Sequence, residues 1–165
     1  MEMKLLHSIS PTKHNSNYNT PEEIMATDGP LSFDGVYSNV SDYPEVFEGR
    51  DITLFVMGSY VGGNNSFDVS QPYEEYCDWN EIMRLVGGYG CKIGWHTWSH
   101  PDLTTLGDAE AIAEITPPFP MEDFGYPYGK WDDRVIQFVK DAGFKRAWSV
   151  FDTDGTEWTL PREYV

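Results

Sequence analysis

Two histidines four residues apart, His96 and His100, are the residues of this sequence best suited to chemistry. Neutral imidazole is a preferred ligand of zinc and related divalent metals, and side chains four apart meet on one side of a helical turn. A catalytic metal also needs a third protein ligand and an open position for water. Asp34, at the end of an expected strand, is the best-placed carboxylate. The sequence therefore predicts a divalent metal, zinc by expectation, held by Asp34, His96 and His100.

Aromatic residues lie between and beside these histidines. Trp95 and Trp98 interleave with the two imidazoles. An indole face can stack on a sugar ring or exclude water, but large aromatic side chains also fill protein cores. Substrate contact and core packing are both open for Trp98. His7 and His14 lie in a polar stretch and are expected to be structural or surface residues.

Short strands and helices alternate along the part of the chain that carries these residues. The apolar, β-branched run at 52–57 is typical of a strand covered on both faces in a parallel sheet. Alternation of this kind predicts an α/β fold, open or barrel-like, with its site at the C-terminal ends of the strands. Asp34 and His96 both follow expected strands. The expected strands are 31–33, 52–57, 92–96 and 146–150.

The expected helices have recognisable ends and apolar faces. A helix that begins at the capping residue Asp78 should end at Gly87-Gly88. A second spans 109–115 and a third about 132–142. The first should bury Trp79, Ile82, Met83 and Val86, and the third should bury Val135, Ile136 and Val139.

Length and composition indicate one globular domain. The chain has 165 residues, of which 40% are hydrophobic and 15% aromatic, which suffices for a substantial core. Residues 8–30 are polar and rich in Pro, Asn and Ser, which predicts a polar N-terminal arm at 1–30. The domain itself is expected to span 31–165.

The charge balance bears on partners. With 27 acidic and 11 basic residues, the formal net charge is −16, so nucleic acid and anionic membranes would be repelled. Cys77 and Cys91 have no disulfide or zinc-knot spacing and are expected to be buried thiols. No apolar run resembles a signal peptide or a membrane span, so the expected location is cytoplasmic or virion-associated. The oligomeric state is left open.

Several segments occur in the order found in a known family. The most specific is 94–103, which contains His-Thr-Trp-Ser-His-Pro, and Leu160-Pro161-Arg162 is similar to a terminal motif of some members. From about Leu31 to Val165 the chain resembles the polysaccharide deacetylase (NodB-homology, carbohydrate esterase family four) family. The other matching segments are Ser32-Phe33-Asp34-Gly35, 52–58 and Tyr126-Pro127-Tyr128-Gly129.

This resemblance implies a fold and an activity. The family fold is a distorted, incomplete (β/α) barrel, and its enzymes hydrolyse the acetamide of N-acetylglucosamine units with a metal held by one Asp and two His. Carried over, the ligands are Asp34, His96 and His100, and Asp34 is also the catalytic carboxylate. The substrate would be an N-acetylated glycan, contacted by Trp98 and by Tyr126, Pro127, Tyr128 and Gly129. The last four can equally form a tight structural turn.

The chain departs from the family pattern at the residues that move protons. Members usually have two Asp before the Gly, the first acting as general base, whereas this chain has one. Asp28 is a weak alternative base. A family Arg that orients the base corresponds to Gly125, and no His follows His100 to act as general acid. A Tyr, an acidic residue or a second subunit could substitute. The alternatives are a catalytically impaired, carbohydrate-binding member and a small-molecule amidase.

Overall fold

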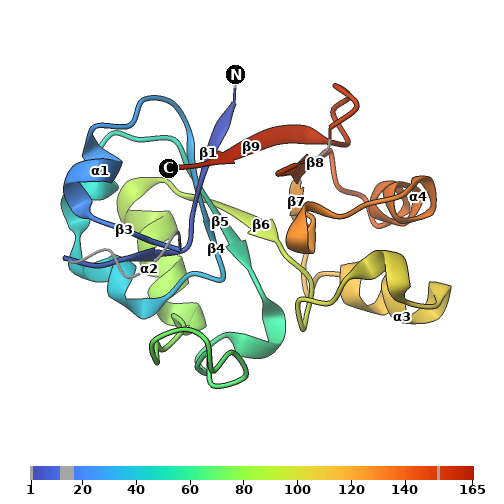
Figure 1. Ribbon diagram of the computed structural model, residues 1–165, viewed down its shortest axis with the longest axis horizontal. Helices are drawn as coiled ribbons and strands as arrows, with labels where there is room; N and C mark the ends of the chain where they lie inside the picture. The colour runs from blue at the N-terminus through green and yellow to red at the C-terminus, as the bar shows by residue number, and fades with distance from the viewer. Residues whose placement is uncertain (1, 12–16, 152) are drawn as a thin grey trace.

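Seven parallel strands form the centre of the molecule, which a computed structural model describes at residues 2–11, 17–151 and 153–165. Each strand pairs with its neighbour in order along the chain, and β9 closes the ring against β1 (Figure 1). The expected (β/α) barrel is confirmed, with one strand fewer than the eight of a complete barrel. The strands are β1 (Met3–Leu6), β4 (Leu31–Asp34), β5 (Ile52–Val56), β6 (Lys92–Trp95), β7 (Asp123–Gly125), β8 (Arg146–Ser149) and β9 (Leu160–Tyr164).

The N-terminal residues belong to this barrel, which corrects the arm expected at 1–30. β1 lies between β4 and β9, and its Leu5 and Leu6 are buried. A two-stranded sheet of β2 (Ser8–Ile9) and β3 (Tyr18–Asn19) and the helix α1 (Pro21–Met25) follow. The sequence pattern is misleading because β1 has four residues, too few to show periodicity among polar neighbours. Residues 12–16, with His14, lie outside the described residues.

Helices cover the barrel on two sides. They are α1 and α2 (Trp79–Tyr89) on one side of the strands, and α3 (Asp108–Ile115) and α4 (Asp133–Asp141) on the other (Figure 1). Asp78 and Asp132 cap α2 and α4, because their carboxylates accept the backbone N–H of the third helical residue, each at 2.8 Å. In the described part of the chain, no helix has the length and apolarity needed to cross a membrane.

The buried faces follow the predictions for α4, and for α2 with one exception. Ile82 is buried, and Trp79 and Val86 are partly buried against the core, as expected. α4 buries Val135, Ile136 and Val139 as expected. α2 continues through both glycines and ends at Gly90, whose φ of 73° suits a glycine. The longer helix brings Tyr89 against Phe47, with ring centroids 5.5 Å apart. Leu85, which precedes the glycines, is also buried. Met83, expected in the core, is 52% exposed.

Apolar side chains fill two regions that are separated by the barrel wall. The larger lies between the strands and the helices and includes Phe33, Leu54 and both free cysteines, which are buried as expected. The smaller, inside the barrel, consists of Met3, Phe55 and Trp148, with Leu160 packed against it. Because successive strand residues point to opposite faces, Phe33 enters the outer region and Asp34 points inward. The strands thereby aim polar residues at the mouth of the barrel.

Candidate functional site

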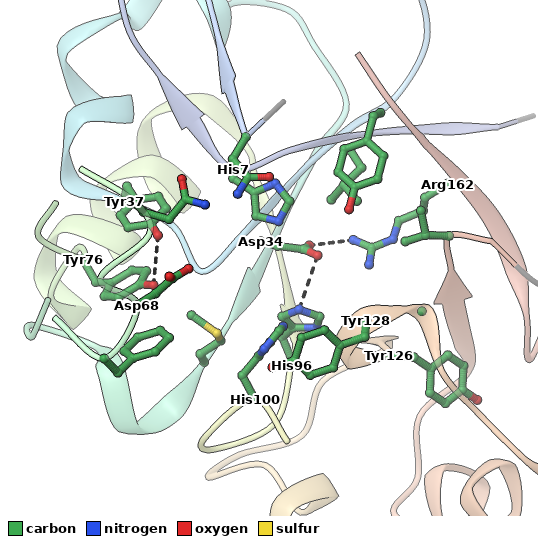
Figure 2. Close-up of a pocket in the computed structure, with 18 residues that line it drawn as sticks. His7, Asp34, Tyr37, Asp68, Tyr76, His96, His100, Tyr126, Tyr128 and Arg162 are labelled. Carbon is green, nitrogen blue, oxygen red and sulfur yellow. Dashed lines mark hydrogen bonds and ion pairs between the residues drawn. The ribbon is translucent and has the colours of Figure 1, made fainter. Parts of the chain in front are cut away.

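One pocket, with a volume of about 260 Å³, collects residues from the ends of all seven barrel strands. Parallel strands present their C-terminal ends at the same rim, so residues that are distant in sequence meet there. Figure 2 shows His7, Asp34, His96, His100 and Arg162 around this space. The residues that end or follow the strands are, in strand order, His7, Asp34, Met57, His96, Tyr126, Val150 and Tyr164.

The Asp34 carboxylate is paired with a buried arginine. Its Oδ1 accepts a hydrogen bond of 2.6 Å from Nη1 of Arg162, a residue of β9 that is 1% exposed. The guanidinium also lies over the Phe55 ring, 4.8 Å from its centroid. Burial alone would raise the pKa of Asp34, but the positive charge of Arg162 and the proximity of His96 lower the pKa to about 2. Asp34 is therefore ionised at neutral pH.

His96 is held so that one ring nitrogen faces Asp34. Its Nδ1 lies 2.7 Å from the carbonyl oxygen of Gly125, which can only accept, so Nδ1 donates. Nε2 lies 3.3 Å from Oδ2 of Asp34. Two ligands of a tetrahedral zinc ion, each about 2.0–2.1 Å from the metal, lie about 3.4 Å apart. Burial lowers the pKa of His96, and the carbonyl contact is the arrangement that commonly orients a metal-binding imidazole.

His100 lies beside His96, but a helical turn does not connect them. Thr97 and His100 have φ angles of 70° and 59°, in the left-handed region. The two imidazole centroids are 4.8 Å apart, and the Tyr128 ring lies 4.6 Å from that of His100. Burial, and then the proximity of His96, lower the pKa of His100 to about 3. Both imidazoles are thus neutral, the state that binds metals.

The three predicted ligands line the same pocket, but their side chains are not arranged around one common point. Among residues 2–11, 17–151 and 153–165, no group of three His, Cys, Asp or Glu side chains is arranged to hold a metal ion. The Asp34–His96 pair has a separation suited to zinc, and His100 adjoins it through its ring. An ionised carboxylate and two neutral imidazoles suit a divalent transition metal. The chemistry of the donors therefore fits, and the third contact is the one that is not formed.

Two pocket residues, His7 and Arg162, have no role in the sequence prediction. Burial lowers the pKa of His7 to about 4, and its ring stacks on Tyr164 at 6.0 Å. Its Nδ1 is buried and has no hydrogen-bond partner within the described parts of the chain. His7 therefore lies at the rim of the barrel and not in a polar arm, which corrects its expected place. The sequence points to Arg162 only through the segment Leu160-Pro161-Arg162, which is similar to a terminal motif of some family members.

The predicted substrate-contacting residues separate into two groups. Tyr126, Tyr128 and Gly129 line the pocket, whereas Pro127 is buried and does not. Trp98 lies outside the pocket, with its ring edge-on to Trp95 at 5.0 Å. Its Nε1 donates to the carbonyl oxygen of Thr116 at 2.9 Å. Core packing is the observed arrangement of Trp98, whereas Tyr128 lines the pocket and is 56% exposed.

The structure explains one departure from the family pattern and corrects another prediction. A Cβ at Gly125 would lie 3.1 Å from His96 Nδ1, so an arginine side chain has no room there. Arg162 reaches Asp34 from β9 instead. Asp28, the weak candidate for a base, is exposed and precedes β4, whereas Asp34 ends that strand. Asp28 therefore lies at the opposite end of the barrel wall from the pocket.

The sequence of this chain is similar to those of known deacetylases. The sequence profile described as polysaccharide deacetylase matches residues 30–147. Chitin deacetylase 1 of Cryptococcus neoformans is 33% identical over 114 residues, covering 63% of this chain and 21% of that protein. A chitooligosaccharide deacetylase of Sinorhizobium fredii is 28% identical over 120 residues, covering 66% of this chain and 47% of that protein. The chain thus spans less than half the length of these two relatives.

Solved structures share the fold. The Streptococcus pyogenes deacetylase PplD, in complex with acetate, aligns with a TM-score of 0.78 at 13% identity, covering 100% of this chain and 92% of that one. IcaB from Ammonifex degensii aligns with a TM-score of 0.74 at 14% identity, covering 99% of this chain and 91% of that one. Identities this low show the fold alone, but the profile covers most of the chain. The chain therefore belongs to the polysaccharide deacetylase family.

Proposed function

We propose that this protein is a metal-dependent hydrolase that removes N-acetyl groups from N-acetylglucosamine-type units of a polysaccharide or its precursor. The observation that carries the proposal is the convergence of Asp34, His96 and His100 on one pocket at the C-terminal rim of the barrel. Its volume of about 260 Å³ is slightly below the roughly 300–1,000 Å³ usual for small-molecule sites. A pocket of this size suits the reacting end of a glycan better than several sugar rings.

Zinc is the metal we propose, held by Oδ2 of Asp34, Nε2 of His96 and the imidazole of His100. When bound, such an ion supplies Lewis acidity for the acetyl carbonyl and for the attacking water. Arg162 holds the other oxygen of Asp34, which fixes the orientation of the carboxylate and keeps it ionised. The Gly125 carbonyl fixes the His96 ring in the same way.

Hydrolysis of an amide also requires a group that removes a proton from water and one that supplies a proton to the departing amine. Asp34 is engaged by Arg162 and by the proposed metal. His7 lines the same pocket, its Nδ1 has no hydrogen-bond partner in the described structure, and its lowered pKa keeps it neutral. A neutral imidazole can accept the proton of the attacking water and return it to the amine nitrogen. We assign this proton transfer to His7.

Tyr128 is the proposed contact for the sugar ring. It stands at the pocket mouth beside His100, with a φ of 58° that turns the chain sharply, and Gly129 follows with a φ of 65°. A half-exposed aromatic ring at the edge of a polar pocket offers an apolar face to a pyranose. Tyr126 lines the same wall, and its hydroxyl is already bonded to the Trp158 carbonyl at 3.0 Å. Tyr126 therefore supports the wall, and of these two tyrosines Tyr128 is the one free to contact substrate.

The test is zinc-dependent release of acetate from N-acetylglucosamine oligomers by the purified protein. Acetate should appear when zinc is supplied, and His100→Ala should abolish it. Phe119→Ala, which removes an exposed aromatic ring outside the pocket, is the control and should retain activity. Glycan binding by calorimetry that survives His96→Ala, with no acetate released by any zinc-loaded sample, would instead support the carbohydrate-binding alternative.

A further inference from the structure

The segment that connects the two histidines has a costly backbone conformation. Thr97 and His100 both adopt positive φ angles, of 70° and 59°, without being glycine. Such angles are unfavourable for side chains with a Cβ and persist only when surrounding contacts enforce them. One contact is local, because the His100 N–H donates to Oγ1 of Thr97 at 3.0 Å. A single local hydrogen bond does not fix the two residues between them.

The carboxylate of Glu114, in α3, binds those two residues. Its Oε2 accepts the backbone N–H of Trp98 at 2.9 Å and that of Ser99 at 2.8 Å. Its Oε1 accepts the Ser99 hydroxyl at 2.7 Å. Hydrogen bonds to an ionised acceptor are stronger than neutral ones. The Glu114 side chain thus accepts three hydrogen bonds from the loop between His96 and His100.

Neighbouring contacts attach the same loop to α3 and to the barrel. The indole N–H of Trp95 donates a hydrogen bond to the backbone carbonyl of Glu114 at 3.0 Å. The indole N–H of Trp98 donates one to the backbone carbonyl of Thr116 at 2.9 Å. On the other side, the carbonyl of Thr97 accepts the N–H of Gly58 at 3.0 Å. Glu114 is not among the residues that line the pocket. Any effect of Glu114 on the pocket must therefore act through the loop between His96 and His100.

We propose that Glu114 is a positioning residue that sets the conformation of residues 97–100 and thereby presents the His100 imidazole to the metal. This inference rests on the proposed metal site. Without the carboxylate, the N–H groups of Trp98 and Ser99 lose their partner, and the left-handed conformations on either side lose their main restraint. Partners that orient metal ligands typically change metal affinity by about 10- to 100-fold when removed.

The experiment compares Glu114→Ala, Glu114→Gln and Glu110→Ala with the wild type by calorimetric titration with zinc alone. Glu114→Ala should weaken the zinc Kd by about 10- to 100-fold. Glu114→Gln should restore most of the affinity, because its amide oxygen can accept both N–H groups and its amide nitrogen can donate to Ser99 Oγ. Glu110→Ala removes a carboxylate four residues earlier in α3, where it caps the helix through the Gly107 N–H. It should lower the Tm and leave the zinc Kd unchanged.

Amide hydrogen exchange of the metal-free protein gives an independent measurement. The Trp98 and Ser99 amides should exchange roughly tenfold faster or more in Glu114→Ala, the factor expected for loss of a charge-assisted hydrogen bond. Absence of zinc binding by the wild type would reject the metal site itself. A wild type that binds zinc while Glu114→Ala matches it in zinc Kd and in exchange would overturn the positioning role. Weakening by Glu110→Ala equal to that by Glu114→Ala would also overturn it.

Discussion

Arg162 Nη1 lies 2.6 Å from Asp34 Oδ1, and both side chains are buried, one from the last strand of the barrel and one from the second. Removal of one partner from a buried ion pair leaves an uncompensated charge. Arg162→Met should therefore lower the free energy of unfolding by about 3–5 kcal/mol, measured by urea denaturation at pH 7. It should also reduce acetate release, because Asp34 loses the contact that orients it.

An exposed ion pair provides the control for this prediction. Lys92 Nζ and Asp51 Oδ1 are 2.7 Å apart, with side chains 51% and 58% exposed. Surface pairs of this kind contribute about 0–1 kcal/mol, so Lys92→Met should have little effect. Equal losses of stability for Lys92→Met and Arg162→Met would show that burial of the Arg162–Asp34 pair does not matter.

The pH dependence of stability should report the buried histidines of the metal-free protein. Burial lowers the pKa of His7 to about 4 and that of His100 to about 3, from the ordinary 6.5. Between these values and 6.5 the unfolded chain binds protons that the folded protein does not, so folding is favoured less as the pH falls. Unfolding free energy should decline from pH 7 to pH 4. The double variant His7→Gln/His100→Gln should show a shallower decline, and an unchanged slope would contradict the assignment.

Asp34 should contribute to a second decline at lower pH. Its pKa of about 2 in the folded protein lies below the ordinary 3.8, so its contribution to stability is present above 3.8 and is lost as the pH falls toward 2. Asp34→Asn should therefore remove part of the slope between pH 4 and pH 2, as measured by urea denaturation. The same variant should leave the slope between pH 6.5 and pH 4 in place, because the buried histidines His7, His96 and His100 produce that part.

The positions of strands and helices could be predicted from the sequence where the pattern is long or well capped. Asp132 and the run that buries Val135, Ile136 and Val139 define α4 correctly. β1 could not be found, because its four residues belong to the barrel only through pairing with β4 and β9. Those partners lie far away in the sequence, and local periodicity carries no information about them.

The same limit applies to the site. Asp34 and His96 share the pocket because one ends and the other follows a strand that could be recognised, and His100 lies in the loop that follows His96. His7 and Arg162 could not be placed, since their positions depend on closure of the barrel between β1 and β9. Trp98 and Tyr128 could not be separated either. Both are aromatic residues near a histidine, and only the fold shows which one faces the pocket.

Two glycines should respond in opposite ways to alanine. At Gly125 a Cβ would lie 3.1 Å from both His96 Nδ1 and the Phe55 ring, which crowds the contact that orients His96. Gly125→Ala should destabilise the protein by about 1–3 kcal/mol and weaken zinc binding. At Gly87, in α2, a Cβ has no neighbour within 4 Å. Gly87→Ala should stabilise the protein by up to about 1 kcal/mol in thermal unfolding, without affecting zinc.

Tyr128 and Trp98 should separate substrate binding from stability. Tyr128 is 56% exposed at the pocket mouth, so Tyr128→Ala should raise the KM for N-acetylglucosamine oligomers with little change in Tm. Trp98 packs on Trp95 outside the pocket, so Trp98→Ala should lower the unfolding free energy by about 3 kcal/mol. Steady-state kinetics and thermal unfolding of both variants test whether Tyr128 contacts substrate and Trp98 supports the fold. A KM effect for Trp98→Ala at unchanged stability would reverse the two assignments.

Anomalous diffraction at the zinc absorption edge from zinc-soaked crystals tests the proposed metal site most directly. We expect one strong peak in the pocket, about 2.0–2.1 Å from both Asp34 Oδ2 and His96 Nε2. The His100 imidazole should rotate to become the third ligand. A peak only elsewhere on this acidic surface, or no peak beside Asp34 and His96, would contradict it.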